Sequence, residues 1–171
     1  MSSRRNFLQK SALSLAGSAV IPFLGSSASL QPHAVMEAAS PLSVGVAGYT
    51  FAKFDLDQSI VMMKRLGVHN LSVKEIHLPL NSSDEKIKIA MGKFKDAGIN
   101  VYTVGVIYMK TKEAVDQAFQ YAKKVGVNMI VGVPNYDLID HAEEQVKAYD
   151  IKLAIHNHGP EDKLYPAPKD V

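Results

Sequence analysis

The sequence of 171 residues contains no cysteine and no tryptophan. Without cysteine the chain can form no disulfide bond, no thiolate zinc site and no thiol nucleophile. It also lacks a G-x-G-x-x-G or P-loop sequence and a G-x-S-x-G sequence, so neither a nucleotide-phosphate loop nor a hydrolase nucleophile elbow is supported. With 47% hydrophobic and 21% charged residues, the composition is that of an ordinary globular protein.

A basic surplus in the folded part of the chain is also missing. Lys and Arg total 19 and Asp and Glu total 17, for a formal net charge of +2. Arg4, Arg5 and Lys10 precede the first acidic residue, Glu37, and the chain after residue 28 carries 16 basic and 17 acidic side chains. Because nucleic-acid binding requires a basic patch on the folded domain, we expect no nucleic-acid partner.

The first 28 residues have the layout of an export signal. A basic start is followed by an apolar stretch, Ser11–Leu24, and by the small residues Ser26-Ser27-Ala28. The sequence Ser3-Arg4-Arg5-Asn6-Phe7-Leu8 resembles a twin-arginine leader. The apolar stretch is shorter than the ~20 residues of a spanning helix. We therefore predict an exported, periplasmic protein with no stable membrane span after cleavage, a linker at 29–41 and a folded body at 42–171.

Strand-like apolar runs alternate with helical stripes along the body. The predicted strands are Leu42–Phe51, Asn70–Leu78, Asn100–Met109, Asn128–Pro134 and Ile151–His156, and the predicted helices are Asp55–Leu66, Ser83–Ala97, Lys112–Val125 and Asp137–Tyr149. Gly67, Gly98 and Gly126 each stand where a helix must stop before the next strand. Strands separated by helices must be parallel and joined by right-handed crossovers.

This pattern predicts an α/β fold with two possible architectures. One is a five-stranded doubly wound parallel sheet. The other is the first five β/α units of a (β/α)8 barrel, since eight units need roughly 200–240 residues. A partial barrel would expose strand edges and apolar helix faces, so we expect possible self-association.

In either architecture, ligands bind at the carboxyl ends of the strands. His156 and His158 flank Asn157 at the predicted end of the fifth strand, and Glu161 and Asp162 follow closely. Neutral imidazole and carboxylate groups together can bind a divalent metal. Alternatively, the two histidines only form hydrogen bonds within the loop.

Four other residues near predicted strand ends are candidates for the site. Lys74 lies within the second predicted strand, where it either pairs with an acid such as Glu75 or reaches the site. His77 could serve the site or the packing of the strand end. Tyr49 and Tyr108 could stack on a sugar ring or pack in the core.

Four segments resemble the sugar phosphate isomerase/epimerase family, the xylose-isomerase-like TIM barrels. They are Leu42–Phe51, Val73–Leu80, Val104–Met109 and, most specifically, Ala154–Asp162 with its His-Asn-His-Gly sequence. The resemblance covers residues 42–171 and implies the first five of eight barrel units. It also implies a divalent metal, Mn, Co, Zn or Mg, at the barrel mouth. The usual ligands are a Glu ending strand five, an Asp on strand six, a His on strand seven and a Glu on strand eight.

The resemblance implies the N-terminal part of an exported, metal-dependent sugar isomerase or epimerase. His156 stands at the position of the strand-five Glu, so it is the predicted metal ligand and, with Lys74, the predicted catalytic group. The predicted substrate-binding residues are Tyr49, His77, Tyr108, His158 and Glu161. The ligands of strands six to eight have no counterpart here, so we expect the chain to be inactive alone.

We expect the substrate to be a sugar or keto-sugar, because an exported protein meets few sugar phosphates. Two alternatives stay open. One is a sugar lyase or hydratase of the same fold, and the other is a non-catalytic periplasmic sugar-binding module.

Overall fold

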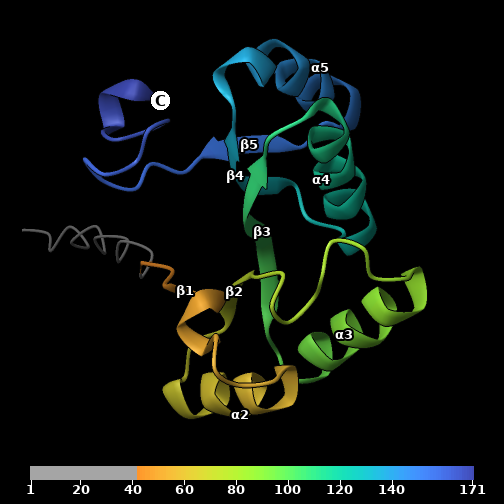
Figure 1. Ribbon diagram of the computed structural model, residues 1–171. Helices are drawn as coiled ribbons and strands as arrows, with labels where there is room; N and C mark the ends of the chain where they lie inside the picture. Colours follow the sequence, from red (N-terminus) through yellow and green to blue (C-terminus); the bar gives the residue numbers. More distant parts are fainter. Residues whose placement is uncertain (1–41) are drawn as a thin grey trace, which may run out of the picture. The chain divides into compact units, whose positions relative to one another are not determined.

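The computed structural model describes residues 42–171, so the predicted signal peptide and linker lie outside the described residues. The described part contains one sheet of five parallel strands with a helix between each pair of consecutive strands (Figure 1). The strands are β1 (Gly45–Ala47), β2 (Asn70–Val73), β3 (Asn100–Met109), β4 (Met129–Pro134) and β5 (Lys152–Ile155). The helices are α2 (Leu56–Leu66), α3 (Asp84–Asp96), α4 (Lys112–Val125) and α5 (Ile139–Tyr149). Short 3-10 turns are η1 (Gly48–Phe51), η2 (Tyr136–Leu138) and η3 (Pro168–Asp170).

The strand order decides between the two predicted architectures. The strands lie in the order β1-β2-β3-β4-β5, and every neighbouring pair is parallel. A doubly wound sheet reverses its direction of winding at an inner strand, which places helices on both faces. Here the chain always advances to the next strand in the same direction, so right-handed crossovers place the helices on one face. Figure 1 shows α3, α4 and α5 along the same side of the strands. The doubly wound alternative is therefore wrong, and the order is that of a (β/α)8 barrel wall.

The helix boundaries follow from local sequence chemistry. Asp55 caps α2 through a reciprocal pair of hydrogen bonds with Gln58, while Thr111 caps α4 by accepting from the Ala114 N–H. The predicted glycine stops are confirmed. Gly67, Gly98 and Gly126 have φ values of +65°, +71° and +83°, a left-handed conformation that glycine adopts without steric penalty.

The first two strands are shorter than predicted. β1 ends at Ala47, because the next residues form the turn η1. β2 ends at Val73, since the Lys74 carbonyl accepts hydrogen bonds from the His77 and Leu78 amides at 2.9 and 3.2 Å. The apolar runs continue beyond both strands because each turn carries one buried apolar side chain, Phe51 in η1 and Leu78 after β2. The prediction that placed Lys74 inside a strand is therefore wrong, and this residue begins the turn after β2.

The hydrophobic core lies between the helices and the sheet. Fully buried strand residues, such as Val104 and Ile130, are in the same core as Val115 and Phe119 of α4. Thr103 is also fully buried, and its hydroxyl donates a hydrogen bond of 2.9 Å to the Met129 carbonyl of the neighbouring strand. Among the described residues, none of the helices combines the length and apolar character that crossing a membrane requires.

Candidate functional site at the carboxyl edge of the sheet

A chain of hydrogen bonds joins three side chains from distant parts of the sequence. The Tyr108 hydroxyl, at the end of β3, lies 3.1 Å from Nε2 of His158. Nδ1 of His158 lies 2.6 Å from Oδ2 of Asp162. The Tyr108 and His158 rings are nearly parallel, with an interplanar angle of 9°. We call this arrangement the Tyr108–His158–Asp162 chain.

Asp162 is held in place by backbone donors. Its Oδ1 accepts hydrogen bonds from the amides of Leu164 and Tyr165, at 2.7 and 3.3 Å. The Leu164 amide contributes most to lowering the pKa of this carboxyl below its usual value, and His158 lowers it further. Asp162 is therefore an ionised carboxylate that can only accept hydrogen bonds.

The segment after β5 folds back against the end of β4 and carries Asp162 with it. Tyr165 is 1% exposed, and its hydroxyl donates a hydrogen bond of 2.8 Å to the Pro134 carbonyl. The Tyr136 ring meets the Tyr165 ring edge-on, with centroids 5.0 Å apart. The His158 amide donates to the Tyr165 carbonyl at 3.2 Å. This anchored segment explains how a loop without regular structure can hold side chains in a defined geometry.

His156 lies beside the hydrogen-bond chain. Its ring meets the His158 ring edge-to-face, with centroids 4.4 Å apart, and its backbone amide donates to the Gly132 carbonyl at 3.0 Å. Burial is the main cause that lowers its pKa, and the charges of His158 and Lys74 lower it further against the opposing charge of Asp162. The imidazole of His156 is therefore neutral at neutral pH and can accept a proton.

Lys74 supplies a positive charge at this edge. Its ammonium group donates a hydrogen bond of 2.5 Å to the Val106 carbonyl of β3 and lies 3.8 Å from Glu75. The Lys74 side chain is 13% exposed, whereas that of Glu75 is 54% exposed. Because an exposed ion pair at this separation is weak, the Val106 carbonyl is the stronger partner. The ammonium group keeps further N–H donors beyond this bond.

The other three predicted site residues, His77, Tyr49 and Glu161, form no hydrogen bond with this group among the described residues. Nε2 of His77 lies 3.2 Å from the Phe51 carbonyl, 3.1 Å from the Phe54 carbonyl and 3.2 Å from the Ser59 hydroxyl, so this ring joins its turn to the start of α2. Tyr49 is 71% exposed in η1.

Sequence reasoning did not identify the structural roles of two residues that build this edge. Asp162 is four residues after His158, and this spacing within His-Asn-His-Gly-Pro-Glu-Asp is the local signal that could have identified it. Tyr165 has no such signal, because its docking against β4 depends on the path of the chain after β5.

The described residues do not complete a metal site. No group of three or more His, Asp or Glu side chains within residues 42–171 comes together in a way that could hold a metal ion. Both ring nitrogens of His158 already have partners. His156, the predicted metal ligand, therefore belongs to no group of three or more potential metal ligands among the described residues.

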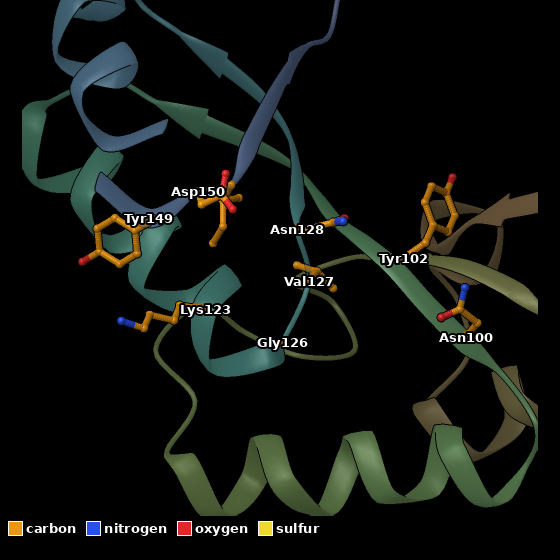
Figure 2. Close-up of a pocket in the computed structure, with 9 residues that line it drawn as sticks. Asn100, Tyr102, Lys123, Gly126, Val127, Asn128, Tyr149 and Asp150 are labelled. Atoms are coloured by element: carbon orange, nitrogen blue, oxygen red, sulfur yellow. The ribbon is translucent and has the colours of Figure 1, made fainter. Parts of the chain in front are cut away.

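A hollow of about 590 Å³ lies at the opposite, amino edge of the sheet. Figure 2 shows Lys123 and Tyr149 on one side of it and Asn100 and Tyr102 of β3 on the other. The Lys123 ammonium lies 5.5 Å from the centre of the Tyr149 ring. The residues that line this hollow end helices or begin strands, so they belong to the turns that return the chain to the sheet.

No protein-family model and no curated protein matches the sequence. Among solved structures, an uncharacterized protein from Parabacteroides distasonis is similar at 28% identity with a TM-score of 0.62, over 68% of this chain and 53% of that protein. A sugar phosphate isomerase/epimerase from the same organism is similar at 16% identity with a TM-score of 0.54, over 77% of this chain and 56% of the other. A xylose isomerase domain containing protein from Salmonella typhimurium LT2 is similar at 15% identity with a TM-score of 0.50, over 67% and 49%.

The chain spans about half the length of the solved structures that it matches. At the identities of the two neighbours with descriptive names, the likeness concerns the fold. The chain therefore has the fold of the xylose isomerase-like and sugar phosphate isomerase/epimerase proteins, which confirms at that level the resemblance found in its sequence.

Proposed function

We propose that the chain acts in the isomerisation or epimerisation of a sugar by moving a proton at a carbon next to a carbonyl group. Two features support this proposal: the fold it shares with sugar phosphate isomerase/epimerase-type proteins and the polar groups at the edge where such folds bind ligands. The observation that carries it is the imidazole of His156, whose pKa is lowered by burial and by the charges of His158 and Lys74.

His156 and Lys74 have complementary tasks in such a reaction. The neutral imidazole removes a proton from the carbon next to the carbonyl, and the carbonyl oxygen gains negative charge. The Lys74 ammonium stabilises that charge. In isomerisation, the hydroxyl proton of the deprotonated carbon then passes to the former carbonyl oxygen, and His156 returns its proton to the former carbonyl carbon. In epimerisation, water supplies a proton to the opposite face of the first carbon, and His156 releases its proton to solvent. General base catalysis of this kind contributes about 10²–10⁴-fold in rate. Because the described residues do not complete a metal site, no step is assigned to a metal.

Exchange of sugar hydrogen with solvent tests the proposal directly. D-Fructose is incubated with the 171-residue chain in D2O, with and without Mn²⁺, and loss of the carbon-bound proton signals is followed by NMR. We expect no net isomerisation from this chain alone, but proton removal requires only His156 and Lys74. We therefore expect exchange above the protein-free rate and a loss of about 10²–10⁴-fold in His156→Gln. The matched control is His69→Gln, which removes an exposed imidazole at the amino edge. Equal rates in the two variants, or no exchange by the unmodified chain, would contradict the proposal.

The same experiment separates the remaining candidates. A lyase or hydratase changes the product mass by one water, whereas an isomerase or epimerase conserves it. Fructose-dependent changes in the protein spectrum without hydrogen exchange would instead indicate a non-catalytic sugar-binding module. The proposal also includes export through the twin-arginine leader, which fractionation of cells that express the chain with Arg4 and Arg5 replaced by lysine would test.

A further inference from the structure

The hydrogen bonds of the Tyr108–His158–Asp162 chain run in one direction. A carboxylate can only accept, so Nδ1 of His158 must carry the proton of the 2.6 Å contact with Asp162. In a neutral imidazole, Nε2 then has a lone pair and can only accept. While His158 is neutral, the Tyr108 hydroxyl, 3.1 Å away, therefore donates its single proton to Nε2.

Asp162 is fixed as the acceptor end of this chain. Its Oδ1 already accepts from the amides of Leu164 and Tyr165, and the same donors favour the ionised carboxylate. Rotating the Asp162 carboxylate cannot present a hydrogen-bond donor to His158, because both carboxylate oxygens only accept. Lys74 and His156 also act electrostatically at this edge. The titratable groups Glu161, Lys163, Tyr136 and Tyr165 belong to the same edge, and none of them replaces the contact of 2.6 Å between Asp162 and His158.

The direction of these hydrogen bonds matters most at Tyr108, the exposed end of the Tyr108–His158–Asp162 chain. Tyr108 is 50% exposed, so its oxygen can meet a ligand. Since its only proton is committed to His158, this oxygen offers lone pairs alone. A sugar hydroxyl can donate to such an oxygen, whereas the phosphate dianion and a carboxylate bring further lone pairs and are repelled.

We propose that Asp162, acting through His158, makes Tyr108 a hydrogen-bond acceptor that selects an uncharged sugar hydroxyl and rejects phosphate at this position. This inference rests on the proposed sugar chemistry of the same edge and assigns its substrate class, a polyhydroxylated sugar without phosphate at the group next to Tyr108. Tyr108 is the specificity-determining residue. His158 and Asp162 are positioning residues.

The first test reads the direction of the bonds without any ligand. Long-range ¹H–¹⁵N spectra at about pH 8, where imidazole is neutral, should show His158 protonated on Nδ1. In Asp162→Asn, the side-chain oxygen keeps the Leu164 amide and the new NH₂ group faces His158, so the proton should move to Nε2. A purely structural role of Asp162 would leave the tautomer unchanged. Protonation on Nε2 in the unmodified chain overturns the inference.

The second test measures selection by titrating the chain with D-fructose and with inorganic phosphate, followed by the Tyr108 and His158 signals. We expect fructose to shift these signals and phosphate to leave them unmoved. Tyr108→Phe, which keeps the ring, should weaken fructose binding about tenfold, and Asp162→Asn should admit phosphate. Tyr102→Phe, at the other end of β3, is the control and should bind fructose as the unmodified chain does.

The possible results are distinct. Phosphate binding as strong as fructose binding at Tyr108, or equal fructose binding by Tyr108→Phe and Tyr102→Phe, overturns the inference. Absence of deuterium exchange together with the expected tautomer and fructose selection overturns only the proposed reaction. An unexpected tautomer in a chain that still exchanges deuterium overturns only the role assigned to Tyr108.

Discussion

The two edges of the sheet use polar residues in different ways. At the amino edge, the Asn100 side chain donates to Asn70 at 3.0 Å, and Asn70 donates to the Ser43 hydroxyl at 2.9 Å. These amides join neighbouring strands to one another. At the carboxyl edge, the linked groups are a phenol, an imidazole and a carboxylate, with an ammonium group nearby. The hollow of about 590 Å³ lies at the amino edge. In this protein, the hollow therefore does not coincide with the hydrogen-bonded titratable groups, which lie at the carboxyl edge.

The difference follows from how the chain enters and leaves the sheet. At the amino edge, each of three helices stops at a left-handed glycine, and a strand follows within a few residues. Such short and similar turns leave little room for variation in the length or the residues of the connection. At the carboxyl edge, each strand leads into a different turn or loop, and function resides in the loops that follow the strands of this fold class.

The largest expected effect comes from removing the anchor of the carboxyl edge. Tyr165→Ala should lower the free energy of unfolding by about 3 kcal/mol, because a fully buried ring and its bond to the Pro134 carbonyl are lost. Tyr102→Ala, a half-exposed tyrosine of the amino edge, should lower it by less than about 1 kcal/mol. Urea denaturation measures both values. Equal losses would show that the two edges are equally well anchored.

A smaller effect should appear at the turns of the amino edge. Gly67→Ala places a Cβ at φ +65° and should destabilise the fold by about 1 kcal/mol, because L-residues avoid this conformation. Gly92→Ala is the matched control within α3, where a new Cβ meets no atom within 4 Å. It should stabilise the fold by up to about 1 kcal/mol. The His158 tautomer should stay unchanged in both variants, and a shift in it would show that the two edges are coupled.

The smallest effect is a dependence on pH at the carboxyl edge. The pKa of Asp162 is lowered from its usual 3.8, chiefly by the Leu164 amide. A group of this kind stabilises the folded state above the usual value, and the contribution disappears as the pH falls through the lowered pKa. The stability difference between the unmodified chain and Asp162→Asn should therefore be present at about pH 5.5 and vanish at strongly acidic pH.

Glu161→Gln is the control for that measurement, since Glu161 is the exposed neighbour of Asp162. We expect its acid unfolding profile, recorded by circular dichroism, to follow that of the unmodified chain. A difference between Asp162→Asn and the unmodified chain that persists undiminished in acid would show that Asp162 does not act through its ionised form.

Much of the fold was predictable from the sequence, because local chemistry decides it. The bounds of β3 and α4, with the Thr111 cap, are those that periodicity and capping residues predict. Both early strands were predicted too long, since apolar residues continue into turns in which Phe51 and Leu78 are buried by tertiary contacts. His156 and His158 could be placed at the end of the fifth strand because their position depends only on the strand boundary.

Only the tertiary structure decided how the strands are ordered and what the site residues touch. The alternation of strands and helices is the same for a doubly wound sheet and for a barrel wall, and the difference lies in which strands pair. Likewise, the contact between Tyr108 and His158 joins residues 50 positions apart. The sequence by itself determined the repeating β/α units and their glycine turns, since neighbouring residues act on one another through short-range forces. The strand order and the direction of the Tyr108–His158–Asp162 chain depend on pairings between distant segments, which no local pattern encodes.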